Sequence, residues 1–335
     1  MERIPVGISG VGSYLPEKIL TNDDLSQMVD TSNEWIVERT GIEQRRIAAK
    51  SQAASDLAIE AGIKALKNAN TNPEEIDLII HASVTPDYTF PSTACIVQHK
   101  INAKNAAAFD MNVGCSGFVY AMATGANFIS SGIYKKVLVI GSEVLSKIIN
   151  WEDRNTCVLF GDGAGAVVLE QCDDGFGILS YDLGSDGENG DVLIVPAGGS
   201  RNPASADSVN GKLHSIQMDG KAVFKFAVKI MGESTINALK KAGLGLEDLD
   251  FLVPHQANTR IIDSSLKRLK LSREKVCVNL NKYGNTSSAS VPIALDEAVK
   301  EGKIKKGDTI VLTAFGAGLT WASIVIKWNR EDGND

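Results

Sequence analysis

The stretch PEEIDLIIHASVTP, residues 73–86, has a similar counterpart in GLEDLDFLVPHQA, residues 245–257. Each stretch begins with an acidic turn, continues as a short apolar run that is typical of a buried strand, and ends in a polar loop. A long helical pattern precedes each stretch, and another helical pattern follows it. The recurrence predicts that one α/β unit occurs twice in the chain.

The elements that follow these two stretches also repeat in order. In the first half, the strand AAAFDMN (106–112) is followed by a helix rich in small residues and by the strand KKVLVIG (135–141). In the second half, VCVNLNKYGN (276–285), the helix VPIALDEAVKEG (291–302) and the strand DTIVLTAFG (308–316) occupy the same places. Because any α/β chain alternates strands and helices, ordinary alternation is the competing explanation of this pattern.

Uninterrupted apolar strands such as VLVI and TIVL predict sheets that helices cover on both faces. Two such units placed together would share a central layer of helices. We predict an α/β fold with a boundary near residue 175. The N-terminal half, 1–175, then carries Cys115, and the C-terminal half, 176–335, carries His255 and Asn285.

Composition narrows the class of protein. A net charge of −7 and a pI near 5.3 argue against a general nucleic-acid binder, because no basic excess offsets phosphate repulsion. No apolar run approaches the roughly 20 residues that a membrane-spanning helix needs. The five cysteines have no CxxC spacing, so neither a metal site nor a disulfide framework is predicted; they are at positions 95, 115, 157, 172 and 277. We expect a soluble, cytoplasmic protein without a membrane or nucleic-acid partner.

Three reactive or polar residues follow predicted strands. Cys115, His255 and Asn285 each lie in a loop directly after a strand or a strand-like run. In α/β folds, ligands bind where such loops converge at the carboxyl ends of the strands. The sequence therefore predicts that the three side chains share one site.

Cys115 lies in the turn NVGCSGF, residues 112–118. If a helix begins at Cys115 and runs to Gly132, the thiol lies at the positive end of the helix dipole, which lowers a thiol pKa. Gly114 and Gly117 would allow close backbone approach and an amide N–H directed at a bound carbonyl oxygen. The alternative is a buried structural cysteine.

His255 and Asn285 each have a functional and a structural interpretation. A neutral imidazole at His255 could donate a hydrogen bond or move a proton, whereas a structural histidine would cap the next helix. Asn285, before a helix, is on its own typical of a turn or an N-cap. Neither residue decides the function alone.

Together these residues carry a resemblance to a known family. The chain resembles the β-ketoacyl-acyl carrier protein synthase III enzymes, condensing enzymes of the thiolase superfamily, over essentially its whole length. The resemblance implies a thiolase-like duplicated fold with five layers, α-β-α-β-α. The motifs, in the order and spacing of the family, are TSNEWIVERTGI (31–42), DMNVGCSGF (110–118), DRNTCVLFGDGAGAVVL (153–169), VPHQANTRI (253–261), YGNTSSASVP (283–292) and AFGAGLTW (314–321).

The resemblance implies a decarboxylative condensation that initiates type II fatty-acid synthesis. Cys115 would take the acyl group of a short acyl-CoA, with acetyl-CoA as the expected primer, and malonyl-acyl carrier protein would then enter the same tunnel. His255 and Asn285 would donate hydrogen bonds to the enolate oxygen that forms as malonyl loses its carboxylate. The backbone amides of Cys115 and Ala317 would form the oxyanion hole. The family needs no metal and no redox cofactor.

Departures from related families favour this assignment. Elongating synthases use two histidines, whereas the second donor motif here holds Asn285. A degradative thiolase would carry a second cysteine in the turn that reads AFGAG here. Plant-type polyketide synthases share the Cys-His-Asn set, but the length and the other motifs favour an initiating synthase. Three alternatives stay open: a condensing enzyme of secondary metabolism, an acyl-thioesterase and a non-catalytic scaffold.

The resemblance also implies binding surfaces. Trp35 and Arg39, four apart on one helix, could stack a purine and bind a phosphate, although a core tryptophan is the competing interpretation. By resemblance the CoA-binding residues are Trp35, Arg39, Thr40, Arg154, Gly220, Phe224, Ala257 and Asn258. The Gly-, Ser- and Asn-rich segment 185–210 is predicted to be a mobile loop near the tunnel mouth.

Two further surfaces concern protein partners. Arg260, Lys267 and Lys270 lie among few acids, so this helix could receive an acidic carrier protein, or it could be an ordinary solvated face. The family associates Arg260 with carrier-protein docking. Phe90 resembles the residue that reaches across a homodimer to the partner's acyl pocket. We therefore expect a homodimer that binds acyl-CoA and acyl carrier protein.

Overall fold

The computed structural model describes residues 4–331. Its first half forms a five-stranded sheet with the strand order β1-β7-β6-β4-β5. β4 pairs in parallel with β5 and β6, whereas β7 is antiparallel to both β6 and β1. The strands are β1 (Val6–Tyr14), β4 (Leu78–Ala82), β5 (Ala107–Met111), β6 (Lys136–Glu143) and β7 (Gly163–Gln171).

The second half forms a four-stranded sheet with the order β8-β13-β12-β11. Its pairing repeats that of the first sheet, because β11 is parallel to β12 and β13 is antiparallel to both β12 and β8. The strands are β8 (Gly177–Ser185), β11 (Phe251–Pro254), β12 (Thr309–Gly316) and β13 (Thr320–Lys327). The expected fifth strand near 276–280 is reduced to a single bridge between Val276 and Leu252.

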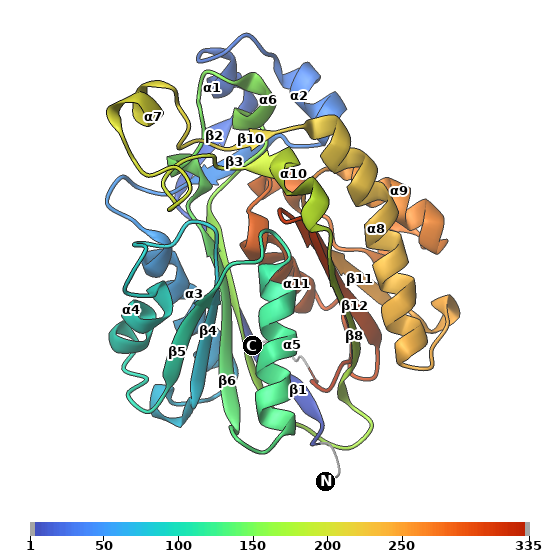
Figure 1. The fold of residues 1–335 in the computed structure, drawn as a ribbon. Helices are drawn as coiled ribbons and strands as arrows, with labels where there is room; N and C mark the ends of the chain where they lie inside the picture. The colour runs from blue at the N-terminus through green and yellow to red at the C-terminus, as the bar shows by residue number, and fades with distance from the viewer. Residues whose placement is uncertain (1–3, 332–335) are drawn as a thin grey trace.

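Helices fill the space between the sheets and cover their outer faces, as Figure 1 shows. α5 (Gly117–Ser130) and α11 (Ser290–Lys300) lie in the middle and contact strands of both sheets. α3 (Ala54–Asn68) and α4 (Thr93–Lys100) cover the first sheet, and α8 (Gly220–Lys241) and α9 (Thr259–Leu269) lie on the outer side of the second. The five-layer α-β-α-β-α fold is therefore confirmed, whereas the boundary at residue 175 stays a prediction.

Small residues make the central layer possible. α5 reads GFVYAMATGANFIS, and nine of its fourteen residues are buried, so both sheets can approach its backbone closely. Ala121, Met122 and Ala126 of α5 and Ala294 and Leu295 of α11 join one apolar core with the inner faces of the two sheets. Burial of this kind supplies most of the stabilisation of such a layer.

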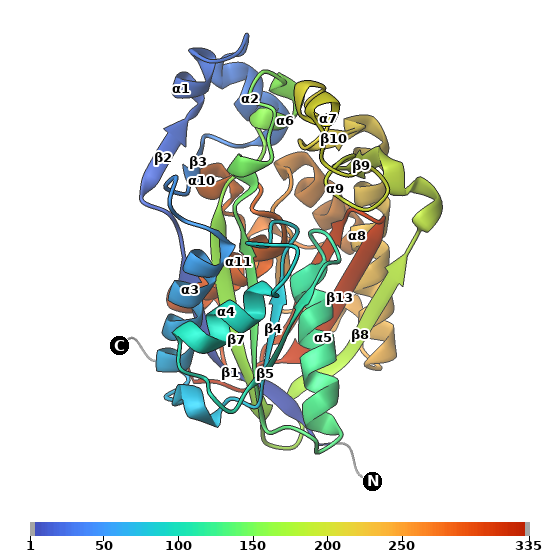
Figure 2. The same cartoon turned by 60° about the vertical axis from the view of Figure 1, so that its left-hand side comes forward.

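Short elements gather at one end of the layers, above the carboxyl ends of the parallel strands, as Figure 2 shows. They include the ribbon β2 (Lys18–Thr21) and β3 (Gln44–Ile47) and the pair β9 (Leu193–Ile194) and β10 (Gln217–Met218). The helices of this end are α1 (Asn22–Ser26), α2 (Asn33–Thr40), α6 (Arg154–Cys157), α7 (Ala206–Asn210) and α10 (Leu280–Tyr283). The remaining short 3-10 turns are η1 (Pro73–Glu75), η2 (Leu145–Lys147), η3 (Gly187–Val192), η4 (Leu246–Asp248), η5 (Arg273–Lys275) and η6 (Ser287–Ala289).

The segment 185–210 contains part of this regular structure rather than loop alone. η3, β9 and α7 all fall within it. α7 is capped at its start, where the Ser205 hydroxyl accepts the N–H of Ser208 at 3.1 Å.

Candidate active site

One cavity brings the three predicted residues together. Cys115, His255 and Asn285 all line it, and its volume is about 100 Å³. Cys115 lies between β5 and α5, His255 follows β11 directly, and Asn285 lies between α10 and η6. The nucleophile candidate thus comes from the first half of the chain and the two donor candidates from the second.

Cys115 is buried, and its surroundings correct two expectations. Helix α5 begins at Gly117 with Ser116 as N-cap, so Cys115 lies two residues before the helix rather than at its first position. Burial raises the pKa of the Cys115 thiol to about 12, and the hydroxyl of Ser287 offsets this only in part. The predicted lowering of this pKa is wrong for the unliganded protein, because burial outweighs the helix end. The resting thiol therefore carries its proton.

Two glycines let the backbone of another turn approach Cys115. Gly114 has φ +55°, and a Cβ there would lie 2.7 Å from the backbone nitrogen of Ala317. A Cβ at Gly316 would lie 2.4 Å from the backbone nitrogen of Cys115. Only glycine fits at both positions, so the turns that carry Cys115 and Ala317 pack directly against each other.

His255 is a neutral hydrogen-bond donor. Burial lowers its pKa to about 3. Its Nδ1 lies 2.6 Å from Oγ of Ser290, and that oxygen also accepts the backbone N–H of Gln256 at 3.3 Å. Donation from the Ser290 hydroxyl to Nδ1 leaves the ring proton on Nε2, and this is the tautomer that a donor role of His255 uses. The ring lies edge-on against Phe315, with the centroids 5.3 Å apart.

Two backbone hydrogen bonds hold Asn285 in place, one through its N–H and one through its carbonyl. Its N–H donates to the carbonyl of Leu159 at 2.8 Å, and its carbonyl accepts the N–H of Gly161 at 3.0 Å. Its side-chain Oδ1 accepts the N–H of Ser287 at 2.8 Å. Because Oδ1 is occupied, the side chain offers Nδ2 as its donor. The site thus contains one thiol and two neutral donors.

The predicted CoA-binding residues fall into two groups. Gly220, Phe224, Ala257 and Asn258 line the cavity with Cys115. At the surface, the guanidinium of Arg39 lies 4.4 Å and that of Arg154 5.1 Å from the centre of the Trp35 ring.

The remaining contacts of this group are internal. Arg154 donates to the carbonyl of Asp30 at 2.8 Å, and the Asn258 side chain donates to the carbonyl of Arg39 at 2.9 Å. Thr40 is buried, and its hydroxyl donates to the carbonyl of Ile36 at 2.7 Å. The Thr40 side chain is therefore engaged in ending α2.

A second cavity adjoins the first at Cys115, and its volume is about 320 Å³. Its walls are mainly apolar, with Val84, Leu145, Phe160 and Leu193 among them. The sequence argument did not find these residues, because each lies in a loop or short element that only the fold brings to Cys115. Leu193 lies in β9, inside the segment that was predicted to be a loop.

The predicted partner surfaces are exposed. Arg260, Lys267 and Lys270 all face solvent on or just after α9, and the neighbouring Arg268 is paired with Glu233 at 2.8 Å. Phe90 is 84% exposed, which is unusual for so large an apolar side chain.

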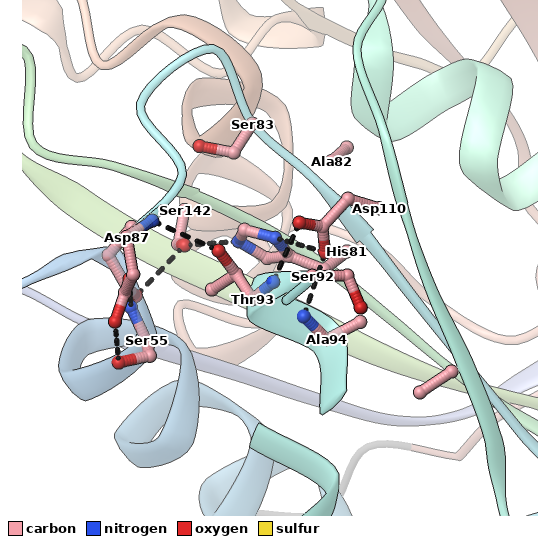
Figure 3. A network of polar contacts seen from close by, with 12 residues as sticks. Ser55, His81, Ala82, Ser83, Asp87, Ser92, Thr93, Ala94, Asp110 and Ser142 are labelled. Carbon is pink, nitrogen blue, oxygen red and sulfur yellow. Dashed lines mark hydrogen bonds and ion pairs between the residues drawn. The ribbon is translucent and has the colours of Figure 1, made fainter. Parts of the chain in front are cut away.

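A polar network around His81 lies at the start of α4, as Figure 3 shows. Nε2 of His81 lies 2.6 Å from Oγ of Ser142, and Nδ1 lies 3.3 Å from Asp110. This Ser-His-Asp order has the form of a hydrolytic triad, but Ser142 and His81 are fully buried and the Ser142 hydroxyl also donates to the carbonyl of Ala54 at 3.0 Å. Asp110 accepts two N–H groups at the start of α4, so the network is structural.

Residues 4–331 contain neither a cluster of metal-ligating side chains nor a membrane-spanning helix. No group of three or more His, Cys, Asp or Glu side chains there is placed to hold a metal ion. The absence of a metal or cofactor requirement stays a prediction. No helix in the same range is long and apolar enough to cross a bilayer.

Comparisons with known proteins identify the family. The family model for 3-oxoacyl-[acyl-carrier-protein] synthase III matches residues 109–187, and the model for its C-terminal part matches residues 239–328. A beta-ketoacyl-[acyl-carrier-protein] synthase III of Caldanaerobacter subterraneus is 63% identical, over 98% of this chain and 99% of that protein. One of Desulfitobacterium hafniense is 57% identical, over 98% and 99%.

Solved structures agree with this result. The crystal structure of 3-oxoacyl-[acyl-carrier-protein] synthase III from Aquifex aeolicus has a TM-score of 0.89 and 48% identity, and covers 96% of this chain and 100% of that one. The duplicated fold and these relatives define an acyl-transferring condensing enzyme of the thiolase class. The chain belongs to the 3-oxoacyl-[acyl-carrier-protein] synthase III family.

Proposed function

We propose that the protein condenses a short acyl-CoA, with acetyl-CoA as primer, with malonyl-acyl carrier protein through an acyl-Cys115 intermediate. In the first step the Cys115 sulfur attacks the thioester carbonyl, the bond to the CoA sulfur breaks, and the thiol proton leaves with CoA. In the second step malonyl loses CO₂, and its enolate carbon attacks the acyl carbonyl. The Cys115 sulfur then leaves and takes up one proton.

The observation that carries the proposal is the pairing of one thiol with two neutral donors around one cavity. Nε2 of His255 and Nδ2 of Asn285 are donors without positive charge, suited to an oxyanion that appears only in the transition state. A cationic histidine would also attract the malonyl carboxylate that must leave. Each of two such donors lowers the barrier by on the order of 3 kcal/mol.

The backbone amides of Cys115 and Ala317 are the proposed oxyanion hole for the acyl carbonyl. The close packing of their two turns, which the glycines at 114 and 316 permit, supports this role. The apolar cavity beyond Cys115 is the proposed acyl pocket.

Partners follow from the same assignment. CoA would place its adenine between Trp35 and Arg154, and its pyrophosphate near Arg39 and Thr40. Its pantetheine arm would lie along the cavity lined by Phe224 and Asn258. Acyl carrier protein would dock at Arg260, Lys267 and Lys270. The exposed Phe90 supports a homodimer in the cytoplasm in which this side chain reaches the partner's acyl pocket.

Intact-mass measurement tests the nucleophile. The protein is incubated with acetyl-CoA and with longer and branched acyl-CoAs, and malonyl-acyl carrier protein is then added. We expect a mass increase of one acyl group that disappears when the second substrate is added. Cys115→Ala should not load, whereas Cys95→Ala, which removes an exposed thiol outside the cavity, should load fully. Loading of Cys115→Ala would refute the assignment.

A further inference from the structure

Glu143 is a fully buried acid at the end of β6, and the proposed reaction does not use it. Its Oε2 lies 2.6 Å from Oγ1 of Thr85 and 3.2 Å from Oγ of Ser83. The backbone N–H of Val84 lies 3.2 Å from both carboxyl oxygens. Its Oε1 lies 2.7 Å from Oγ of Ser288. The carboxyl group therefore joins the segment after β4 to the turn that follows Asn285.

The hydroxyl protons around Glu143 can be assigned one by one. Oγ of Ser83 accepts the N–H of Thr85 at 3.0 Å, and Oγ1 of Thr85 accepts the N–H of Val144 at 2.9 Å. Both hydroxyls are therefore free to donate to Oε2. An oxygen that receives two hydroxyl donors does not itself need to carry a proton.

On the Oε1 side of Glu143, the two contacts of the Ser288 hydroxyl require one more hydrogen than that hydroxyl has. Oγ of Ser288 lies 2.7 Å from Oε1 of Glu143 and 2.9 Å from the carbonyl oxygen of Ala82. A hydroxyl has one proton, and a carbonyl can only accept. If Glu143 is ionised, one of these two short contacts has no hydrogen. If Glu143 carries a proton on Oε1, it donates to Ser288, Ser288 donates to Ala82, and every contact is satisfied.

We propose that Glu143 is a positioning residue that stays protonated and holds the Asn285–Ser288 turn against Cys115 without placing a charge beside the thiol. This inference rests on the proposed roles of Cys115 and Asn285.

Two further observations support the neutral form. Burial raises the pKa of Glu143, and hydrogen bonds from Thr85 and Ser288 act in the opposite direction. A negative charge on Glu143 is, after burial, one of the causes that raise the pKa of the Cys115 thiol. A neutral acid avoids that penalty on the thiolate and on the enolate.

The turn that Glu143 holds is under conformational strain. Ser287 has φ +49°, a region that side chains other than glycine rarely adopt, and its N–H is the group that orients Asn285. Ser288 follows it directly and is tied to Glu143. Loss of the Glu143 contact should therefore let the turn relax and misplace Nδ2 of Asn285.

The first test measures alkylation of Cys115 by iodoacetamide, which requires no substrate. Glu143→Gln replaces the protonated acid with a neutral group of the same shape, so the alkylation rate should stay within about twofold of wild type between pH 7 and 9. If Glu143 were ionised, removal of its charge would raise the rate about tenfold, and that result would overturn the inference.

The second test separates the two half-reactions. Glu143→Ala should slow decarboxylation of malonyl-acyl carrier protein about 10- to 100-fold, while acyl transfer to Cys115 changes by less than about fivefold. Glu143→Gln should restore decarboxylation, and Glu143→Asp, whose chain is one methylene shorter, should not. An equal loss in both steps, or an inactive Glu143→Gln, contradicts the positioning role.

Asp296→Asn is the matched control. Asp296 is an equally buried carboxyl in α11, paired with Lys300 at 2.7 Å and remote from the cavity walls. It should alter neither half-reaction. If Glu143→Ala does not fold, as thermal melting will show, Glu143→Gln and Glu143→Asp still decide the question. Failure of the proposed function itself would show differently, as absence of acyl loading in the wild-type protein.

Discussion

At the scale of single residues, the Cys115 thiol and the His255 imidazole are both neutral, unlike the thiolate and imidazolium of a cysteine–histidine ion pair. The Cys115 pKa is raised to about 12 and the His255 pKa is lowered to about 3, both by burial. Neither group is charged near neutral pH. Acyl transfer must therefore move the thiol proton while the substrate is bound, instead of starting from a preformed thiolate and imidazolium pair.

The raised pKa of the Cys115 thiol predicts how the rate of its alkylation depends on pH in the absence of substrate. Because the thiol pKa lies far above neutrality, the thiolate fraction, and with it the rate, should rise about tenfold per pH unit from pH 7 to 9 without a plateau. Stopped-flow or mass-resolved iodoacetamide labelling measures it, with Cys115→Ala giving the background of the other thiols. A plateau near pH 7 would show instead that the helix end dominates.

The three proposed catalytic residues were predictable from the sequence: Cys115 and His255 follow strands at the end where ligands bind, and the family motif YGNTSSASVP marks Asn285, which follows the short helix α10. Glu143 and Ser287 were not. Glu143 ends the apolar strand KVLVIGSE, and a charge at that point usually marks the strand's exit into solvent. Its burial depends on Ser288, 145 residues further along the chain, and no local pattern reports such a contact.

At the scale of elements, the approach of the Cys115 and Ala317 turns depends on the absence of side chains. Gly316→Ala would place a methyl group 2.4 Å from the backbone nitrogen of Cys115, so one turn must move. We expect acyl loading to fall at least about 100-fold, because a shift of 1 Å in such a site costs that much. Intact-mass loading rates and thermal melting measure the effect.

Gly62→Ala provides the control for that substitution. Gly62 lies within α3, where a new Cβ would meet Ile140 and Leu138 at an ordinary 3.5 Å. Replacing a helical glycine with alanine should stabilise the fold by up to about 1 kcal/mol and leave loading unchanged. Equal effects of the two substitutions would mean that the contact at Cys115 has no special importance.

The elements themselves followed the sequence patterns closely, with informative exceptions. α5 begins two residues later than expected, since Cys115 and Ser116 are used for the turn. The run at 276–280 has strand composition, but it lies at the sheet edge and α10 begins at Leu280, which leaves one bridge. β9 has two residues, too few to produce a period. In each case tertiary contacts decided the outcome.

At the scale of the whole molecule, the acidic chain carries a local basic surface. The net charge is −7, yet Arg260, Lys267 and Lys270 are exposed along α9 and at its C-terminal end. The net negative charge of the molecule would repel an acidic carrier protein, whereas these three basic side chains would attract it. Such a charge pattern determines where the partner docks more than how tightly it binds.

Charge removal tests this surface. Arg260→Ala combined with Lys267→Ala should raise the KM for malonyl-acyl carrier protein about tenfold at low salt, with little change at high salt, because screening already weakens the wild-type attraction. The KM for acyl-CoA should stay within about twofold. Lys104→Ala, an exposed lysine beside Glu74 elsewhere on the surface, is the control. An unchanged KM for the carrier protein in the double variant would reject this site.

The ring of Trp35 already has stacking partners within the protein, because the guanidinium groups of Arg39 and Arg154 lie within stacking distance of it. A nucleotide base that stacks on Trp35 competes with these guanidinium groups for the ring, and Arg154 is also tied to Asp30. The free energy gained when the base stacks on Trp35 is then offset by the loss of an arginine contact worth about 0.5–1 kcal/mol. The adenine would thus orient the substrate and add little to its affinity. CoA would then leave readily once its acyl group has been transferred.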